Sequence, residues 1–269
     1  MAQMTEISEG GLYYDGSKES LQTAIAIAQA VVDAGVRQEQ TDVNVAVSAL
    51  ESAILTAMAS QAVTYVTFEE LTASEWSDPS AARGQATVSG DEIQLSFQTG
   101  NRTEVVYDKL IGSREILCFE FALDQQNSWH GFAIGQSDRA KFITNATGYF
   151  VCFSGDKIEL QKYIDGKKVT GNNLLEITNT GESKLFASGK TYSIQLGALQ
   201  NADGSVRIFF KVDDNVIIDY LDTENPIVGD NGFGVVIQKL ATNGVAHLKQ
   251  ADLTEVEKAD YTVLETELA

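Results

Sequence analysis

The chain has few of the residues that mark disulfide-stabilised or metal-binding proteins. Its 269 residues include two cysteines, two histidines and two prolines. Two cysteines allow at most one disulfide bridge, and two isolated histidines with two cysteines in strands do not make a zinc site. We therefore expect Cys118 and Cys152 to be small, half-buried thiols and predict no metal ligands among these residues.

Basic residues are also scarce, and long apolar runs are missing. The chain has 19 basic and 38 acidic residues and a net charge of −19. Such a surface repels nucleic acids and anionic membranes, and it favours neutral or cationic ligands. No apolar run is long enough to span a membrane. Residues 1–6 lack the basic region and apolar core of a signal peptide, so none is expected.

Two kinds of hydrophobic periodicity divide the chain. Residues 1–16 are polar and contain glycine, which predicts a lead-in or a short strand. Residues 17–61 have apolar residues at helical spacing and predict two antiparallel helices separated at Gly35. The expected stripes are Leu21, Ile25, Ala28 and Val32, then Val43, Val47, Leu50, Ile54 and Met58. Two helices alone bury such stripes poorly, so we expect the pair to dock on the rest of the chain.

From residue 63 to residue 253 the period becomes two, with Gly, Asn and Asp between the segments. Many short strands without intervening helices predict a mainly β fold, an antiparallel two-sheet jelly-roll sandwich. Residues 254–269 are acidic and predict a tail or a closing strand. The expected strands are 64–70, 85–89, 91–98, 102–108, 114–123, 129–135, 148–154, 157–164, 191–199, 205–212, 216–222, 231–238 and 244–253.

The clearest of these segments is a hairpin. Two apolar runs, 206–212 and 216–222, flank an acidic turn, which predicts a three-residue loop. In that register Val212 faces Val216, Phe210 faces Ile218 and Ile208 faces Tyr220. The turn, 213–215, is a candidate Ca²⁺ site because its side chains carry oxygen ligands, although turns favour Asp and Asn for their own geometry. No other cofactor is expected.

The helical segment resembles a FIVAR-type repeat. The likeness lies in LQTAI at 21–25, Ala28, and VSALESAI at 47–54. These modules occur in multidomain bacterial surface proteins and secreted polysaccharide-degrading enzymes. The resemblance implies a spacer rather than a catalyst, within a larger parent protein.

The strand-rich segment resembles the concanavalin-like or laminin-G-like jelly-roll superfamily. The matching segments are, in chain order, WHGFAIG at 129–135, IELQKY at 158–163, YLD at 220–222, GFGV at 232–235 and AHL at 246–248. That superfamily includes lectins, carbohydrate-binding modules, glycosidases, lyases and adhesion domains, so the fold alone does not set the function. The two resemblances together imply an extracellular or cell-surface location.

Strand alternation separates an apolar face from a second, polar or singly aromatic face. If the second faces belong to one sheet, they form a surface suited to a sugar, whose C–H faces pack on rings and whose hydroxyls need polar partners. The predicted carbohydrate-binding residues are Glu120, Trp129, Gln161, Tyr163, Gln195, Arg207 and Lys211. Trp76 is either a rim contact or a packing residue. His130 is predicted to be a satisfied core histidine, and His247 a structural residue.

The resemblance therefore implies a non-catalytic module that binds a polysaccharide or oligosaccharide. Two alternatives stay open, a structural or adhesion domain and a polysaccharide-active glycosidase or lyase. A glycosidase needs two carboxylates about 5–10 Å apart, which Glu120 and Glu159 could provide from different strands. A lyase would use a base such as Tyr163 beside Arg207 and Lys211. The Glu-x-Asp-x-x-Glu motif of concanavalin-like glycosidases is missing, so no catalytic residue is assigned.

Overall fold

The chain forms two compact units, Met1–Val63 and Thr64–Ala269. The structure is a computed structural model, and it describes residues 4–6, 12–14, 17–34, 40–59, 63–69, 76–77, 84–89, 91–97, 102–124, 129–138, 145–169, 173–181, 184–201, 204–229, 231–238 and 244–254. The predicted tail, 254–269, lies outside these residues except for its first residue.

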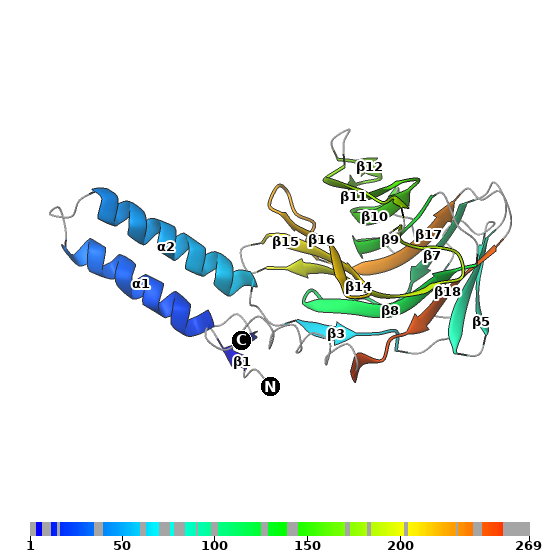
Figure 1. Cartoon of the computed structure of the whole chain (residues 1–269), viewed down its shortest axis with the longest axis horizontal. Helices are drawn as coiled ribbons and strands as arrows, with labels where there is room; N and C mark the ends of the chain where they lie inside the picture. The colour runs from blue at the N-terminus through cyan, green and yellow to red at the C-terminus, as the bar shows by residue number, and fades with distance from the viewer. Residues whose placement is uncertain are drawn as a thin grey trace. The chain divides into compact units, whose positions relative to one another are not determined.

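The first unit contains a two-stranded ribbon and a helical hairpin (Figure 1). Strands β1 (Met4–Glu6) and β2 (Leu12–Tyr14) pair antiparallel. Helices α1 (Ser17–Ala34) and α2 (Gln40–Ala59) pack against each other. The two predicted helices are therefore present, and each ends within a few residues of the expected position.

The buried side of these helices differs from the predicted stripes. Ala24 and Ala46, which were not among the predicted stripe residues, are buried. Ile25, Val32 and Val47, which were, have exposed fractions of 50%, 70% and 49%. Leu21, Ala28, Val43 and Leu50, which were also predicted, are half-buried, so the stripes were right in part. The apolar surface of each helix is wider than the strip that the other helix covers. The side chains of Ile54 and Met58 lie outside the described part of the chain, and the docking of the pair stays a prediction.

The second unit is a sandwich of two sheets, which confirms the mainly β prediction (Figure 1). We call them the β8 sheet and the β9 sheet. The β8 sheet runs in the order β16 (Asn215–Asp222), β15 (Val206–Val212), β14 (Thr191–Gln200), β8 (Glu115–Leu123), β18 (Gly244–Gln250), β6 (Glu92–Phe97) and β5 (Gly84–Ser89). The β9 sheet runs in the order β12 (Lys167–Lys168), β11 (Lys157–Ile164), β10 (Gly148–Ser154), β9 (Trp129–Gln136), β17 (Gly232–Gln238), β7 (Arg102–Tyr107) and β4 (Trp76–Ser77).

Two further strands lie beside these rows. Strand β13 (Leu175–Thr178) pairs with β11, and β3 (Thr64–Val66) pairs with β8 in parallel, an exception in otherwise antiparallel sheets. The sequence did not indicate β4, β12 or β13, and it predicted a longer β3. Strands of two to four residues are too short to show a clear alternation of apolar and polar residues.

The hairpin differs from its prediction at the turn. The pairs Ile208–Tyr220 and Phe210–Ile218 are confirmed, but Val212 pairs with Asn215 instead of Val216. The loop therefore has two residues, and a β-bulge after Phe210 takes up the difference. Asp213 has a φ of 51°, a conformation that Asp tolerates better than most residues. Because of the bulge, Ile218 still faces the core.

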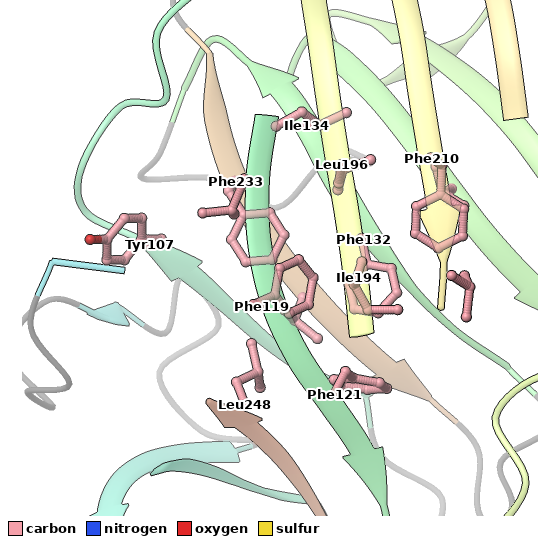
Figure 2. Packing of buried hydrophobic residues seen from close by; sticks show 14 of the residues in the cluster. Tyr107, Phe119, Phe121, Phe132, Ile134, Ile194, Leu196, Phe210, Phe233 and Leu248 are labelled. Carbon is pink, nitrogen blue, oxygen red and sulfur yellow. The ribbon is translucent and has the colours of Figure 1, made fainter. Parts of the chain in front are cut away.

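The core lies between the two sheets. Figure 2 shows side chains of the β8 sheet, such as Phe119, Leu196 and Phe210, packed against Phe132 and Phe233 of the β9 sheet. The rings of Phe119 and Phe233 meet edge to face at 5.3 Å between centroids. The predicted core face of β8, residues 117, 119, 121 and 123, is buried as expected.

His130 lies in this core, as predicted, but its hydrogen-bonding groups are not satisfied. Both ring nitrogens are buried and have no hydrogen-bond partner among the described residues. The imidazole stacks on Phe153 at 4.8 Å and meets Phe186 edge to face at 5.0 Å. Burial lowers the pKa of His130 to about 3, so the ring is neutral in the folded protein at neutral pH.

A buried ion pair connects the β9 sheet to the edge of the β8 sheet. Lys162 on β11 donates to Asp222 at the end of β16 over 2.5 Å, and both side chains are almost fully buried. Lys162 also donates to the carbonyl oxygens of Glu224 and Asn225. Tyr149 donates to the same carboxylate, and burial with this hydrogen bond raises the pKa of Tyr149 above its usual range. Every proton of the ammonium therefore has an acceptor.

Candidate functional site

The predicted site residues lie on two different outer faces of the sandwich. The outer face of the β9 sheet, away from the core between the sheets, carries Trp129 on β9 and Gln161 and Tyr163 on β11. The residues on the outer face of the β8 sheet are Glu120, Gln195, Arg207 and Lys211. The expectation of one shared surface was wrong, because alternation tells which side of a strand is buried but not which sheet the strand joins.

Trp76 is a packing residue. It is buried, and its ring lies 5.2 Å from Phe68, 5.2 Å from Tyr107 and 6.1 Å from Phe233. Strand β4, at the edge of the β9 sheet, holds it against β7 through the pair Trp76–Tyr107. The indole contributes to the core at one end of the sandwich, so the rim-contact alternative is not supported.

The outer face of the β9 sheet carries a second apolar cluster. Ala133, Phe150, Cys152 and Val236 are fully buried there, and Trp129 and Tyr163 pack against them half-exposed. The rings of Trp129 and Phe150 are 5.5 Å apart and tilted by 44°. We call the surface made by Trp129, Glu159, Gln161 and Tyr163 the β9 face. The apolar cluster at its centre is fully buried, and the rings of Trp129 and Tyr163 packed against it are half-exposed.

Polar side chains on β11 continue this surface. Tyr163 donates to the Oε1 atom of Gln161 over 2.9 Å, and Gln161 Nε2 donates to Glu159 over 2.5 Å. Residues i, i+2 and i+4 of a strand share a face, which sets these three in a row. Trp129 lies opposite Ser154 on β10, and Tyr163 lies opposite Gly148. Those positions are six residues apart in β10, so the backbones of Trp129 and Tyr163 are about 20 Å apart along the strand direction.

The outer face of the β8 sheet holds a hollow of about 240 Å³ above Ala122. Its polar wall consists of Glu92, Glu120, Asp124, Thr191, His247 and Lys249. His247 hydrogen-bonds to Glu92 through Nδ1 over 2.9 Å and to Asp124 through Nε2 over 2.8 Å. The sequence treated His247 only as structural, and no local motif joins it to carboxylates 123 and 155 residues away.

The electrostatics of this hollow depend on His247. Partial burial on its own would lower the pKa of His247, but the hydrogen bonds to Glu92 and Asp124 and their charges raise it above its usual value. Hydrogen bonds from Gln94 and His247 lower the pKa of Glu92 despite its burial. The hollow therefore favours the ionised form of the Glu92 carboxylate and the protonated form of the His247 imidazole.

The other predicted residues of the β8 sheet offer little to a ligand. Arg207 forms a two-bond fork with Asp219, at 2.6 and 2.7 Å. Gln195 and Lys211 are buried. The Oε1 atom of Gln195 has no hydrogen-bond partner among the residues that the structure describes. Of the four predicted residues on this sheet, Glu120 alone lines the hollow.

Both catalytic combinations suggested by the sequence are separated by the fold. Glu120 lies on the outer face of the β8 sheet and Glu159 on that of the β9 sheet, so the two do not face one another. Tyr163 is likewise on the opposite side from Arg207 and Lys211. Neither the predicted carboxylate pair nor the predicted lyase set is assembled.

The cysteines and the acidic turn have local structural roles. Cys118 and Cys152 are free and fully buried, where half-burial was expected, and they belong to different sheets. Asp213 accepts a hydrogen bond from the Ser193 amide over 3.0 Å and lies 3.5 Å from Lys190. Within the described ranges, no three His, Cys, Asp or Glu residues are grouped so as to hold a metal ion. None of the described helices has the length and apolarity needed to cross a membrane.

Comparisons with known proteins give similarity at the level of solved structures only. No protein-family model and no curated protein matches the chain. A carbohydrate binding module, CBM66 from Bacillus subtilis, is 15% identical, with 69% of this chain and 96% of that chain covered and a TM-score of 0.43. The potassium-bound carbohydrate recognition domain of Emp46p is 9% identical, with coverages of 66% and 89% and a TM-score of 0.46. A GH16 protein of the Bacteroides ovatus mixed linkage glucan PUL, in complex with a product, is 13% identical, with coverages of 68% and 96% and a TM-score of 0.44. Similarities of this size carry no argument about the ligand of this chain.

Proposed function

We propose that the strand-rich unit is a non-catalytic carbohydrate-binding module of a secreted or surface bacterial protein, and that the β9 face binds a neutral polysaccharide. The observation that carries the proposal is that two half-exposed rings, Trp129 and Tyr163, share the outer face of one sheet with a hydrogen-bonded polar row. The FIVAR-like helices would then be a spacer in a longer protein.

The chemistry of the β9 face suits a sugar chain. The apolar face of a pyranose packs on an aromatic ring, and its hydroxyls need donors and acceptors that are already oriented. Gln161 is itself buried, and its hydrogen bonds hold the half-exposed side chains of Glu159 and Tyr163 in place, so these two lose less side-chain freedom on binding. The net charge of −19 disfavours polysaccharides rich in uronic acid or sulfate.

The test compares two aromatic truncations on opposite sheets. Trp129→Ala should weaken binding to a neutral polysaccharide about 10-fold or more, since aromatic anchors dominate such contacts. Phe209→Ala is the matched control, because Phe209 is half-buried on the outer face of the β8 sheet. Affinity gel electrophoresis against a panel of polysaccharides, with and without calcium, measures both variants and tests the 213–215 turn.

Three outcomes separate the alternatives. Loss of binding in Trp129→Ala and normal binding in Phe209→Ala support the β9 face. Equal loss in both variants, or in Phe209→Ala alone, contradicts it. A wild-type protein that binds none of the polysaccharides favours the structural or adhesion alternative.

The hollow on the β8 sheet favours a second candidate, a glycosidase. Glu92, Lys249 and Glu120 form one cross-strand row, so the two glutamates are two strand spacings apart, about 10 Å between Cα atoms. Glycosidase carboxyl groups are about 5–10 Å apart. The lowered pKa of Glu92 favours its ionised form, which suits a base or nucleophile.

Catalysis at this hollow predicts a specific loss. Glu120→Gln should lower the release of reducing ends from a polysaccharide at least about 100-fold, as removal of an acid–base group does. Glu176→Gln is the control, because this exposed glutamate pairs with Lys157 outside the hollow. Reducing-end release that persists in Glu120→Gln, or that is missing in the wild type, excludes this candidate.

A further inference from the structure

His247 connects three neighbouring strands on the outer face of the β8 sheet. It lies on β18, opposite Gln94 of β6 and Ala122 of β8. Its hydrogen-bond partners, Glu92 and Asp124, are each two positions along the chain from those residues. Such diagonal neighbours lie within reach of a long side chain across a sheet. We call Glu92, His247 and Asp124 the histidine bridge.

The two carboxylates set a condition on the protonation of His247. Nδ1 lies 2.9 Å from Oε1 of Glu92, and Nε2 lies 2.8 Å from Oδ1 of Asp124. An ionised carboxylate only accepts hydrogen bonds, and a neutral imidazole has only one N–H group. Both contacts are therefore hydrogen bonds only while the imidazole is protonated. Loss of that proton turns a lone pair of the ring toward one of the two carboxylates.

The two ends of the bridge differ in how firmly they are held. The side chain of Glu92 is 15% exposed, accepts a second hydrogen bond from Gln94 over 2.7 Å, and lies 3.9 Å from Lys249. The side chain of Asp124 is 51% exposed, and among the described residues its carboxylate hydrogen-bonds to His247 alone. Water can replace the imidazole at an exposed carboxylate at far less cost than at a buried one. A neutral His247 therefore keeps its proton on Nδ1 and releases Asp124.

The other charged groups around the hollow do not replace the proton of His247. Glu120 on β8 adds a third carboxylate to the wall, and the wall residue from β14 is uncharged. Lys249 on β18 is a cation two residues from His247. It lies 3.4 Å from Asp91 and 3.9 Å from Glu92, so these two carboxylates offset its charge.

We propose that the histidine bridge is a pH-dependent switch that changes the shape of the hollow on the β8 sheet. With a protonated imidazole, the bridge ties Asp124 at the end of β8 to β18 and β6. Release of the proton lets the Asp124 carboxylate turn into solvent, which opens that side of the hollow, while Glu92 and His247 stay together. The bridge lies on the opposite sheet from the β9 face, so this inference does not depend on the proposed sugar site.

An NMR titration of the imidazole groups of the full chain tests the switch. The chain has two histidines, and His130 has a pKa of about 3, so His247 gives the signal that titrates between about pH 5 and pH 9. Partial burial lowers the pKa of His247, but the hydrogen bonds and charges of Glu92 and Asp124 raise it more, so the midpoint should lie above the ordinary 6.5. Above the midpoint, the long-range ¹H–¹⁵N spectrum should show the proton on Nδ1.

Three variants test which groups set this midpoint. Asp124→Asn and Glu92→Gln should each move the midpoint of His247 down toward 6.5. Asp91→Asn is the matched control, because it removes a carboxylate beside the same hollow that contacts Lys249 rather than His247, and it should move the midpoint by less than either. A wild-type midpoint at or below 6.5, a midpoint that Asp124→Asn does not lower, or a neutral ring with its proton on Nε2 overturns the proposal.

The free energy of unfolding gives a second readout. A histidine whose pKa is higher in the folded than in the unfolded chain stabilises the fold below the unfolded-state pKa and loses that contribution as the pH rises through the folded-state pKa. The wild type should therefore be more stable than Asp124→Asn at about pH 6, and the difference should disappear by about pH 9. His130 is present in both proteins, so its own titration cancels. A difference that does not change with pH overturns the proposal.

Discussion

Replacement of Lys162 by methionine should lower the free energy of unfolding of the strand-rich unit by about 3–5 kcal/mol. Methionine fits the space but leaves the Asp222 carboxylate buried without its counter-charge, with the Tyr149 hydroxyl as its remaining side-chain donor. Denaturant unfolding followed by tryptophan fluorescence measures the loss, because Trp76 and Trp129 both belong to this unit.

Two further variants separate the buried charge from the loss of a side chain. Lys157, on the same strand as Lys162, pairs with Glu176 of β13. Both partners are about half exposed, so Lys157→Met should cost less than about 1 kcal/mol. Lys162→Met/Asp222→Asn removes the unpaired charge and should be more stable than Lys162→Met alone. Equal costs for Lys157→Met and Lys162→Met would contradict the assigned role of the buried pair.

Replacement of His130 by phenylalanine should raise the free energy of unfolding by about 1–3 kcal/mol at neutral pH. Phenylalanine keeps the stack on Phe153 and removes two buried ring nitrogens that have no hydrogen-bond partner among the described residues. Thermal and denaturant unfolding of the two proteins at pH 7 measure the gain. A variant less stable than the wild type would show that these nitrogens are satisfied in solution.

The difference in free energy of unfolding between His130→Phe and the wild type should also grow as the pH falls. The folded-state pKa of His130 is about 3, below the value of about 6.5 in the unfolded chain. Between these values the unfolded state binds a proton that the folded state does not, so the wild type loses stability as the pH decreases. The difference in free energy of unfolding between the variant and the wild type should increase by about 3 kcal/mol from pH 7 to pH 4. A difference in free energy of unfolding that does not change with pH would contradict the claim that the His130 imidazole is buried and neutral.

The local order of apolar, polar and turn residues in the sequence was enough to predict most strands and their buried sides. The segments 148–154 and 157–164 match β10 and β11 because Gly and Asp turns bound them. Segment 148–154 is a nearly continuous apolar run, and apolar and polar residues alternate at the start of 157–164. The placement of His130 on the core side followed from its parity with Phe132 and Ile134 in the same way. These features depend on neighbours in the chain, which a sequence displays directly.

The features that the sequence could not show depend on partners far along the chain. Glu120 and Trp129 are only nine residues apart, yet they lie on opposite sides of the sandwich because β8 and β9 join different sheets. The hollow needs His247 to meet Glu92 and Asp124, and the bulge after Phe210 needs the exact loop length between β15 and β16. On the helices, Ala24 and Ala46 are the most deeply buried described residues, although larger residues beside them are more hydrophobic.

The most direct test of the β9 face is a map of amide chemical shifts during titration with an oligosaccharide from the bound polysaccharide. The largest changes should fall in β9, β10 and β11, around Trp129 and residues 159–163, with little change in β8, β14 and β15. Changes centred on Glu120, Asp124 and His247 instead would place the sugar in the hollow of the β8 sheet and contradict the proposed surface.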